Sequence, residues 1–425
     1  MKRHGWLLGV WCGIAACATT ALADGVIRDG LGARSTGRGG TNIAFADTGV
    51  IIYDNPGGMT NVAGCGLAEA GFDILLPVTV YGDPDNPGGV DGADNPFPAG
   101  QVSIIRKFGR LALGAGFFAP AGFGSDYLMN GPAPFFAGPQ QYKSLGMMMK
   151  FLPGAAYQVT DRLSIGATLG VGINHMELEG PYSLQSPGQL QGTPALFDLQ
   201  ATGAAPVWSV GLQYKATHRT TLGLSYIAET RFHNHGDTVM QIPGVGVNEY
   251  QTDLQTTWPQ SLGLGVKHRL LSQLAVSADV IWFDWSNAKE NYTANFSQPT
   301  NPVVAGLAPT LTEVYPLNWR DSVTVRLGSE YYLCGHRTLR AGYIYHRNPI
   351  PDDTLTPWIQ TTLEHGVSAG YGWQFRRDWN VDLAYQFNWG NPRNVGDSSF
   401  IGDDFSNSRM VTEAHWAYFS VMRRF

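Results

Sequence analysis

The chain is poor in charged residues. Asp, Glu, Lys and Arg make up 15% of it, whereas soluble domains contain about 25%. The formal net charge is −6, and positively charged residues form no cluster. A nucleic-acid partner is therefore not expected, because such a partner requires a basic surface.

Cysteine is also scarce. Two of the four cysteines, Cys12 and Cys17, lie close to the N-terminus, and the other two are Cys65 and Cys334. This spacing matches neither a CxxC metal site nor a disulfide framework. Either a Cys65–Cys334 bridge in an oxidising compartment or two separate thiols is compatible with the sequence.

A long uncharged apolar run is missing after the first residues, so the mature chain has no candidate membrane-spanning helix. Residues 1–23 have the pattern of a removable export signal: Lys2 and Arg3, an apolar run over 6–18, and a small-residue cleavage site ending at Ala23. The alternative is a lipoprotein signal that would be lipidated at Cys17.

Glycine and aromatic residues are abundant, with 53 glycines and 12% Phe, Trp and Tyr. Many segments alternate strictly between apolar and small or polar residues. Residues 163–174, for example, pair Leu163, Ile165 and Ala167 with Ser164, Gly166 and Thr168. Alternate side chains of a strand point to opposite faces, so these segments are strands with one apolar face.

About fourteen such strands are expected, many of them longer than the usual 5–6 residues. Short turns at 109–110, 160–161, 217–219, 271–272, 335–337 and 377–378 alternate with long loops at 82–98, 121–144, 179–204, 241–249, 291–317, 349–359 and 391–409. Long tilted strands with alternating short and long connections are typical of outer-membrane barrels. The sequence therefore predicts an all-β fold, a 14-stranded antiparallel transmembrane β-barrel over residues 65–425.

Residues 24–64 precede the first strand and do not alternate. They are rich in glycine and carry Arg34, Arg38 and Asp47, which can pair only in polar surroundings. We expect this segment to fold into the polar lumen as a small hatch. The alternative is a disordered periplasmic arm.

Several motifs resemble the FadL-type long-chain fatty acid transporter family of outer-membrane proteins. They are Gly37-Arg38-Gly39-Gly40, Tyr53-Asp54-Asn55-Pro56-Gly57-Gly58-Met59, the stretch 116–124, and the late-strand segments 321–327, 339–342 and 368–371. Two positions depart from the family pattern. Asp54 is added between Tyr and Asn, and Gly57 replaces Ala, which makes the firmness of the hatch an open question because glycine is more flexible.

The resemblance implies a monomeric barrel with an N-terminal hatch, an apolar groove among the extracellular loops, an inner apolar pocket, and an opening in the wall at a kinked third strand. It implies passive uptake of a hydrophobic ligand, either a long-chain fatty acid or an aromatic or alkane hydrocarbon. Outer-membrane lipid and lipopolysaccharide would surround the barrel. The alternatives are a general porin for polar solutes and a structural or adhesive surface protein.

Candidate ligand-binding residues lie around the 121–144 segment, which is unusually apolar for an exposed loop. They are Phe117, Phe118, Phe123, Leu128, Phe135, Phe136, Met147 and Met149. Methionine suits an adaptable ligand wall. Packing of the loops on each other, and lipid contact for some of the methionines, are the alternatives.

Candidate hatch and gating residues are Asn55, Pro56 and Gly57 in the hatch and Gly114, Gly116 and Pro120 in the third strand. Proline cannot donate to a β-ladder and glycine often marks a kink, so the latter three could bend this strand. Ordinary strand termination is the alternative.

Signals for catalysis or cofactors are absent or accidental. The G-x-S-x-G match at 366–370 lies inside an alternating strand rather than in a strand–turn–helix elbow. His233 and His235 could supply half of a metal site, but no further ligand accompanies them. The early glycines lack the strand and helix of a nucleotide loop. We expect no catalytic site, metal or cofactor.

Overall fold

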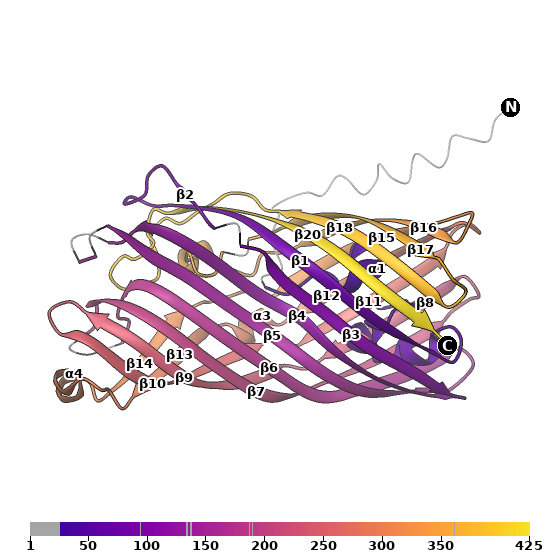
Figure 1. Cartoon of the computed structure of the whole chain (residues 1–425), viewed down its shortest axis with the longest axis horizontal. Coiled ribbons are helices and arrows are strands. Elements are labelled where there is room, and N and C mark those ends of the chain that lie inside the picture. The colour runs from indigo at the N-terminus through magenta and orange to yellow at the C-terminus, as the bar shows by residue number, and fades with distance from the viewer. Residues whose placement is uncertain are drawn as a thin grey trace.

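The structure is a computed structural model that describes residues 26–425 except 94, 133, 134, 137, 187, 189 and 361. The predicted export signal, with Cys12 and Cys17, lies outside the described residues. Strands tilted across the long axis form the wall of the molecule, with helix α1 (Gly32–Gly37) inside it (Figure 1).

Fourteen antiparallel strands form a closed wall, as predicted. Closure comes from the pairing of the first and last strands, which runs from Leu67↔Arg424 to Gly82↔Arg409. Ten wall strands are continuous: β1 (Gly66–Gly82), β3 (Phe97–Phe108), β4 (Leu111–Asn130), β5 (Pro139–Gln158), β6 (Leu163–Ser183), β7 (Pro194–Lys215), β16 (Arg337–His346), β17 (His365–Gln374), β18 (Trp379–Trp389) and β20 (Arg409–Arg424).

The other four wall strands are each interrupted once. They are β8 (Thr220–Ile227) with β9 (Thr230–Ile242), β10 (Gly246–Trp258) with β11 (Ser261–Arg269), β12 (Leu274–Phe283) with β13 (Asn291–Ser297), and β14 (Thr310–Pro316) with β15 (Ser322–Leu333). Two short strands, β2 (Val90–Asp91) and β19 (Arg393–Asn394), lie in connections. The remaining elements outside the hatch are α3 (Trp285–Ala288), α4 (Pro302–Leu307) and η2 (Asp352–Thr354).

Apolar and polar residues that alternate in the sequence lie alternately on the outer and inner faces of the wall. On β6, Leu169 is 67% exposed on the outer face, whereas the neighbouring Thr168 is buried on the inner face. Apolar side chains outside and small or polar ones inside are what a lipid-facing barrel requires. The pairing of neighbouring strands around the wall matters because an unsatisfied backbone group in hydrocarbon costs several kcal/mol.

Strand lengths correct part of the sequence prediction. The 121–144 segment is mostly a β-hairpin, because β4 and β5 pair from Ala121↔Met148 to Asn130↔Pro139. The 179–204 segment likewise contains the ends of β6 and β7, and 291–317 contains β13 and β14. The wall thus extends well beyond the predicted strands at the end that carries the long connections, on the left in Figure 1.

Residues 26–64 lie inside the barrel, which confirms the expected hatch. Besides α1, the hatch contains α2 (Ile51–Asp54) and the 3-10 helix η1 (Pro56–Asn61). Helix α1 packs on β17, β18 and β20, whereas η1 packs on β5, β6 and β7. The hatch therefore bridges opposite sides of the lumen. No helix in the described part of the chain is long and apolar enough to cross a membrane.

Candidate functional site

The hatch is held to the wall by the Asn55-Pro56-Gly57 motif. The Asn55 side-chain amide donates to the carbonyl oxygens of Ile43 and Leu212, at 2.8 and 3.0 Å. Its carbonyl oxygen accepts a hydrogen bond from the Gly57 backbone N–H at 3.1 Å, which caps η1. One buried side chain thus joins two parts of the hatch to strand β7.

Gly57 gives a close approach between hatch and wall. A Cβ at this position would lie 2.7 Å from the carbonyl oxygen of Gly211 on β7. Gly114 on β4 has the same role, since a Cβ there would lie 2.8 Å from the sulfur of Met59. The glycine that replaces the family's alanine therefore allows the hatch to approach the wall closely.

An ion network fixes the other side of the hatch. Arg38 is fully buried and donates to Asp47 at 2.9 and 3.0 Å and to Glu330 of β15 at 3.1 Å. Arg340 of β16 bonds both Glu330 and Asp382, each at 2.7 Å. Because every charge of this network has a partner, the cost of desolvating these groups is offset only while the hatch is seated.

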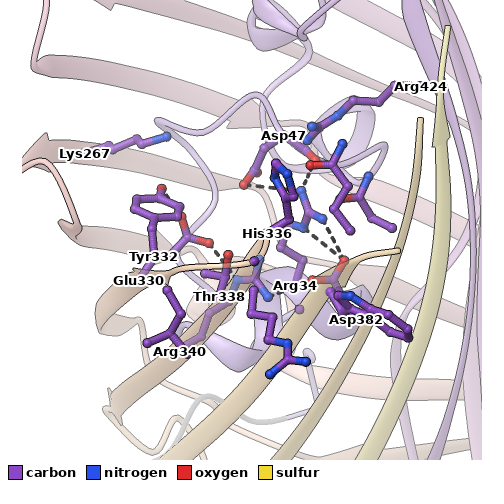
Figure 2. Close-up of a pocket in the computed structure, with 17 residues that line it drawn as sticks. Arg34, Asp47, Lys267, Glu330, Tyr332, His336, Thr338, Arg340, Asp382 and Arg424 are labelled. Atoms are coloured by element: carbon purple, nitrogen blue, oxygen red, sulfur yellow. Dashed lines mark hydrogen bonds and ion pairs between the residues drawn. The ribbon is translucent and has the colours of Figure 1, made fainter. Parts of the chain in front are cut away.

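Asp47 and Arg34 complete this network. The Arg34 guanidinium contacts Asp382 of β18 at 2.7 Å. Burial alone would raise the pKa of Asp47, but the neighbouring Arg38 and Arg34 outweigh burial and hold it well below its ordinary value. Figure 2 shows Arg34, Arg340 and Asp382 converging between hatch and wall.

A polar vestibule lies beside this network on the side of the short turns. Its volume is about 510 Å³, and its lining includes Lys267, Arg337, Arg424 and the turn residue His336 (Figure 2). Because the short turns are the periplasmic ones in such barrels, the vestibule faces the periplasm. Its wall of charged groups does not suit an apolar solute.

The third strand of the wall, β4, loses its pairing with β3 partway along its length, and we call this point the wall break. Strands β3 and β4 pair only up to Gln101↔Phe118, although β4 continues to Asn130. The register between β4 and β5 shifts between Phe118 and Ala121, on either side of Pro120. The expected irregularity is thus present at Pro120, whereas Gly114 and Gly116 pair in regular register with β3 and β5. It is a bulge within a continuing strand rather than the end of one.

The start of the described hatch covers this break. The Arg28 N–H donates to the carbonyl oxygen of Pro120, and the Gly122 N–H donates to that of Val26, both at 3.0 Å. Ile27 and Ala121 form the bridge between these two bonds. The Arg28 side chain forms an ion pair with Asp73 on β1. Residues 26–28 therefore act as a short extra strand on the free edge of β4.

Aromatic side chains fill the lumen at the end with the long connections. We call this group the extracellular cluster; it includes Tyr182, Phe197, Trp258, Phe283, Trp285, Tyr292, Phe296, Trp319 and Trp358. Trp285 and Trp319 have ring centroids 4.8 Å apart, and Trp358 meets Phe197 edge to face at 5.4 Å. An apolar interior with this many aromatic rings, enclosed by polar loops, is suited to a hydrophobic ligand.

Lys289 is buried within the extracellular cluster. Its ammonium donates to the Tyr292 hydroxyl at 2.9 Å and lies 5.3 Å from the centroid of the Trp258 ring. Among the described residues no carboxylate lies within ion-pair distance of it. Burial lowers the pKa of Lys289 to about 7.

An inner cavity of about 80 Å³ lies between the extracellular cluster and the hatch. Its apolar lining includes Val26, Ile27, Leu75, Pro77, Phe123 and Trp358. The Asp29–His346 ion pair, with a separation of 2.7 Å, marks its polar side. Gly122 and Gly124 also line it, so the cavity borders the wall break.

The predicted ligand-binding residues divide between the two faces of the wall. Phe118, Phe123 and Phe136 are buried, with Phe123 on the inner cavity. Phe117 and Leu128 lie on the outer face, and Phe135 is exposed at the hairpin tip. Phe118 and Phe123 can face the same lumen because the bulge between them shifts the alternation by one residue.

The three consecutive methionines, Met147 to Met149, face the opposite way from the prediction. Met148 is buried in the extracellular cluster, between the inward-facing Tyr142 and Lys150 in the alternation of β5. Met147 and Met149 lie on the outer face, so their expected position in the lumen is wrong. Three consecutive methionines fit either alternation, and only the neighbouring strands decide which one faces inward.

The sequence prediction missed an inward-folded loop. Residues 347–364, between β16 and β17, were expected to include an ordinary extracellular loop at 349–359. Instead Leu355, Trp358 and Gln360 are all at least 95% buried inside the barrel mouth. The available signal was the apolar content of Ile350, Leu355, Trp358 and Ile359 within one connection.

The residues considered for other chemistry find ordinary roles. His235 pairs with Asp253 on the exposed face of β9 and β10. Among the described residues no group of three His, Cys, Asp or Glu side chains could hold a metal ion. The G-x-S-x-G match falls in β17, where Ser368 accepts a hydrogen bond from the Gly39 N–H at 3.0 Å. Cys65 and Cys334 are exposed, unbridged thiols.

Comparison with known proteins agrees with this architecture. Residues 14–422 match the family model described as outer membrane protein transport protein (OMPP1/FadL/TodX). The chain is 21% identical to the long-chain fatty acid transport protein of Escherichia coli O6:H1 (strain CFT073) over 396 residues, which is 84% of each chain. A protein of the same description from Salmonella typhi is 21% identical over 193 residues, 42% of either chain.

Solved structures share the fold. A Pseudomonas aeruginosa FadL homologue superposes with a TM-score of 0.79 at 17% identity, covering 94% of this chain and 99% of that one. The P. putida toluene transporter TodX superposes with a TM-score of 0.78 at 20% identity, covering 93% and 99%. At these identities the likeness establishes the barrel and its topology.

Proposed function

This chain belongs to the OMPP1/FadL/TodX family of outer-membrane transport proteins, and we propose that it admits hydrophobic small molecules by passive uptake. The observation that carries the proposal is the continuous sequence of apolar surfaces. The extracellular cluster leads to the inner cavity, and the inner cavity borders the wall break. A ligand on this route would stay out of water throughout.

The polar vestibule supports a sideways exit. An apolar ligand that passed the hatch would enter a space lined by charged groups, and re-exposing its surface to water costs about 25 cal/mol per Å². At the wall break, the backbone bonds to be opened include those of residues 26–28 with β4. In this proposal, the ligand displaces residues 26–28 and leaves into the membrane between β3 and β4.

Two classes of cargo are compatible with the apolar route: long-chain fatty acids and neutral hydrocarbons. The related proteins are described as transporters of long-chain fatty acids in one case and of toluene in another. Lys289 favours the carboxylate-bearing class for this chain. Its buried ammonium has a neutral hydroxyl and aromatic rings as partners, and a ligand carboxylate would complete its pairing.

The experiment compares uptake in cells that lack the gene with uptake in cells that carry wild type or Lys289→Met. We expect the deletion to lower uptake of hexadecanoate, and K289M to lower it about tenfold relative to wild type, since a charge-assisted bond is worth about 1.5–3 kcal/mol. Toluene uptake should be the same in K289M and wild type.

The control is Lys143→Met, which removes a partly exposed lysine paired with Glu177 on the outer face. Unchanged uptake of every hydrophobic compound after deletion would refute the transport proposal. If K289M lowered toluene and hexadecanoate uptake equally, the carboxylate assignment alone would be wrong.

We also propose that lipopolysaccharide surrounds the extracellular end of the barrel. Above the apolar band, the outer face carries polar side chains near the extracellular ends of β4–β10, among them Asp126, Lys143, His175, Glu177 and Asp253. This belt is suited to the charged head groups of lipopolysaccharide. The pairing of β1 with β20 closes the wall, and residues 26–28 bond to the free edge of β4, which leaves little strand edge for a second copy to extend and supports a monomer.

A further inference from the structure

The inward-folded loop, described at residues 347–360 and 362–364, spans the mouth of the barrel. It connects β16 and β17, yet it is bonded to strands on the opposite side of the wall. Trp358 donates through Nε1 to the carbonyl oxygen of Glu179 on β6 at 2.7 Å, and its own carbonyl oxygen accepts from Ser144 of β5 at 2.6 Å. Gln360 donates to the Tyr127 hydroxyl on β4. The loop therefore crosses the lumen and does not only cover its rim.

Trp358 is the part of this loop that separates the outside from the inner cavity. On one side its ring meets Phe197 at 5.4 Å and Phe405 of an extracellular connection at 5.2 Å, both edge to face. On the other side it lines the inner cavity together with Phe123. The ring therefore stands between Phe197 and Phe405 on one side and the inner cavity on the other.

The seat of the Trp358 ring is made by a glycine. A Cβ on Gly180 of β6 would lie 2.9 Å from Cζ2 of the ring, so a larger side chain there would push the ring aside. The ring is 95% buried, and two hydrogen bonds hold its backbone and its Nε1. Such a well-held bulky side chain restricts the width of the passage without carrying charge.

We propose that Trp358 is the size-determining residue of this transporter: it passes slim ligands such as linear acyl chains and slows ligands with broad fused rings. This inference rests on the proposed uptake function, and it adds a specificity role for a loop outside the hatch and the wall break. Thr412 helps to hold the loop in place, since its hydroxyl donates to the carbonyl oxygen of Gln360 at 2.7 Å.

The test measures uptake of two carboxylates that differ in width, hexadecanoate and 12-(1-pyrenyl)dodecanoate, in cells that carry wild type, Trp358→Ala or Trp358→Leu. We expect W358A to raise the uptake ratio of the pyrenyl acid to the linear acid about tenfold, which is a typical discrimination by one apolar pocket contact. W358L, which retains more apolar volume, should give an intermediate ratio.

The matched control is Trp285→Ala. Trp285 is fully buried in the same extracellular cluster but does not line the inner cavity, so its loss should change the uptake of both acids by the same factor and leave their ratio at the wild-type value. Heat-dependent migration in gels reports whether each barrel is folded. If W358A does not fold, W358L and direct binding of the pyrenyl acid to purified protein, followed by fluorescence, carry the comparison.

Two results would overturn the proposal: an unchanged ratio in both folded Trp358 variants, or an equal rise in W285A, which would indicate general loosening of the cluster. A wild type that takes up neither acid better than cells without the gene would instead refute the proposed function itself.

Discussion

Asp54 illustrates how much a single hatch residue can change. It is the position inserted into the Tyr-Asn-Pro motif of the family, and it faces a small internal cavity of about 40 Å³. Its carboxylate accepts a hydrogen bond from the Asn42 amide at 2.5 Å. Burial raises the pKa of Asp54 to about 6, from an ordinary 3.8.

This raised pKa predicts a pH-dependent hatch. The seated hatch binds the Asp54 proton more tightly than the released one, so the stability that Asp54 contributes is fully present below about pH 4 and is lost as the pH rises through 6. The Asp54→Asn variant should lose this dependence, because its side chain stays neutral and can still accept from Asn42. At pH 8 its hatch amides should exchange hydrogen about tenfold more slowly than those of wild type.

The measurement is the ratio of exchange rates in wild type and D54N at each pH, which cancels the intrinsic effect of pH on exchange. Equal ratios at pH 4 and pH 8 would show that Asp54 does not titrate in the seated hatch.

At the scale of elements, β4 combines two functions in one strand. Its first half pairs with β3 and completes the wall, whereas its second half lacks that partner and is bonded by residues 26–28 at Pro120 and Gly122 and by Ala93 at Asp126. Pro120 between the halves has no N–H to lose from a ladder. Strand β4 therefore stays paired with β5 along one edge, whereas along its other edge the pairing with β3 ends and leaves a weak point in the wall.

The bridge between Ile27 and Ala121 gives a direct test of this weak point. The two flanking hydrogen bonds make it a non-hydrogen-bonded pair, with a Cα separation of about 4.5 Å that suits a disulfide. In a background with Cys65→Ser and Cys334→Ser, the oxidised double variant Ile27→Cys/Ala121→Cys should take up hydrophobic ligand at least about tenfold more slowly than its reduced form, because the exit route is locked.

Reduction with dithiothreitol should restore uptake in the double variant and change nothing in either single variant. Equal uptake by the oxidised and reduced proteins would place the exit elsewhere than between β3 and β4.

At the scale of the molecule, three regions follow one another along the lumen. They are the extracellular cluster with the inward-folded loop, the inner cavity, and the hatch with its ion network. This arrangement distinguishes the protein from a general porin. Wild-type protein in planar bilayers should show almost no ion conductance, since charged solutes meet an aromatic interior before they reach the vestibule.

Loss of the central arginine should create conductance. Arg38→Met leaves Asp47 and Glu330 with fewer partners in the interior, and breaking a buried pair in this way costs about 3–5 kcal/mol. We expect intermittent channel openings in R38M bilayers. Arg110→Met is the matched control, because its ion pair with Asp161 is exposed and 3.6 Å long. Openings in R110M, or none in R38M, would contradict the role of the network.

The sequence by itself determined the barrel, because alternation with a period of two depends only on neighbours along the chain. Leu169 beside Thr168 on β6 shows this directly. The sequence also indicated the hatch, since Arg34, Arg38 and Asp47 cannot remain unpaired in a lumen, and it indicated the irregularity at Pro120.

Only the tertiary structure decided what depends on contacts between distant strands. It placed Met148 rather than Met147 and Met149 inside, because strand register sets the face. It paired Arg38 with Glu330, 292 residues away in sequence, and it folded Trp358 into the lumen against β5 and β6. Such choices follow from packing across the barrel, which no local pattern of residues contains.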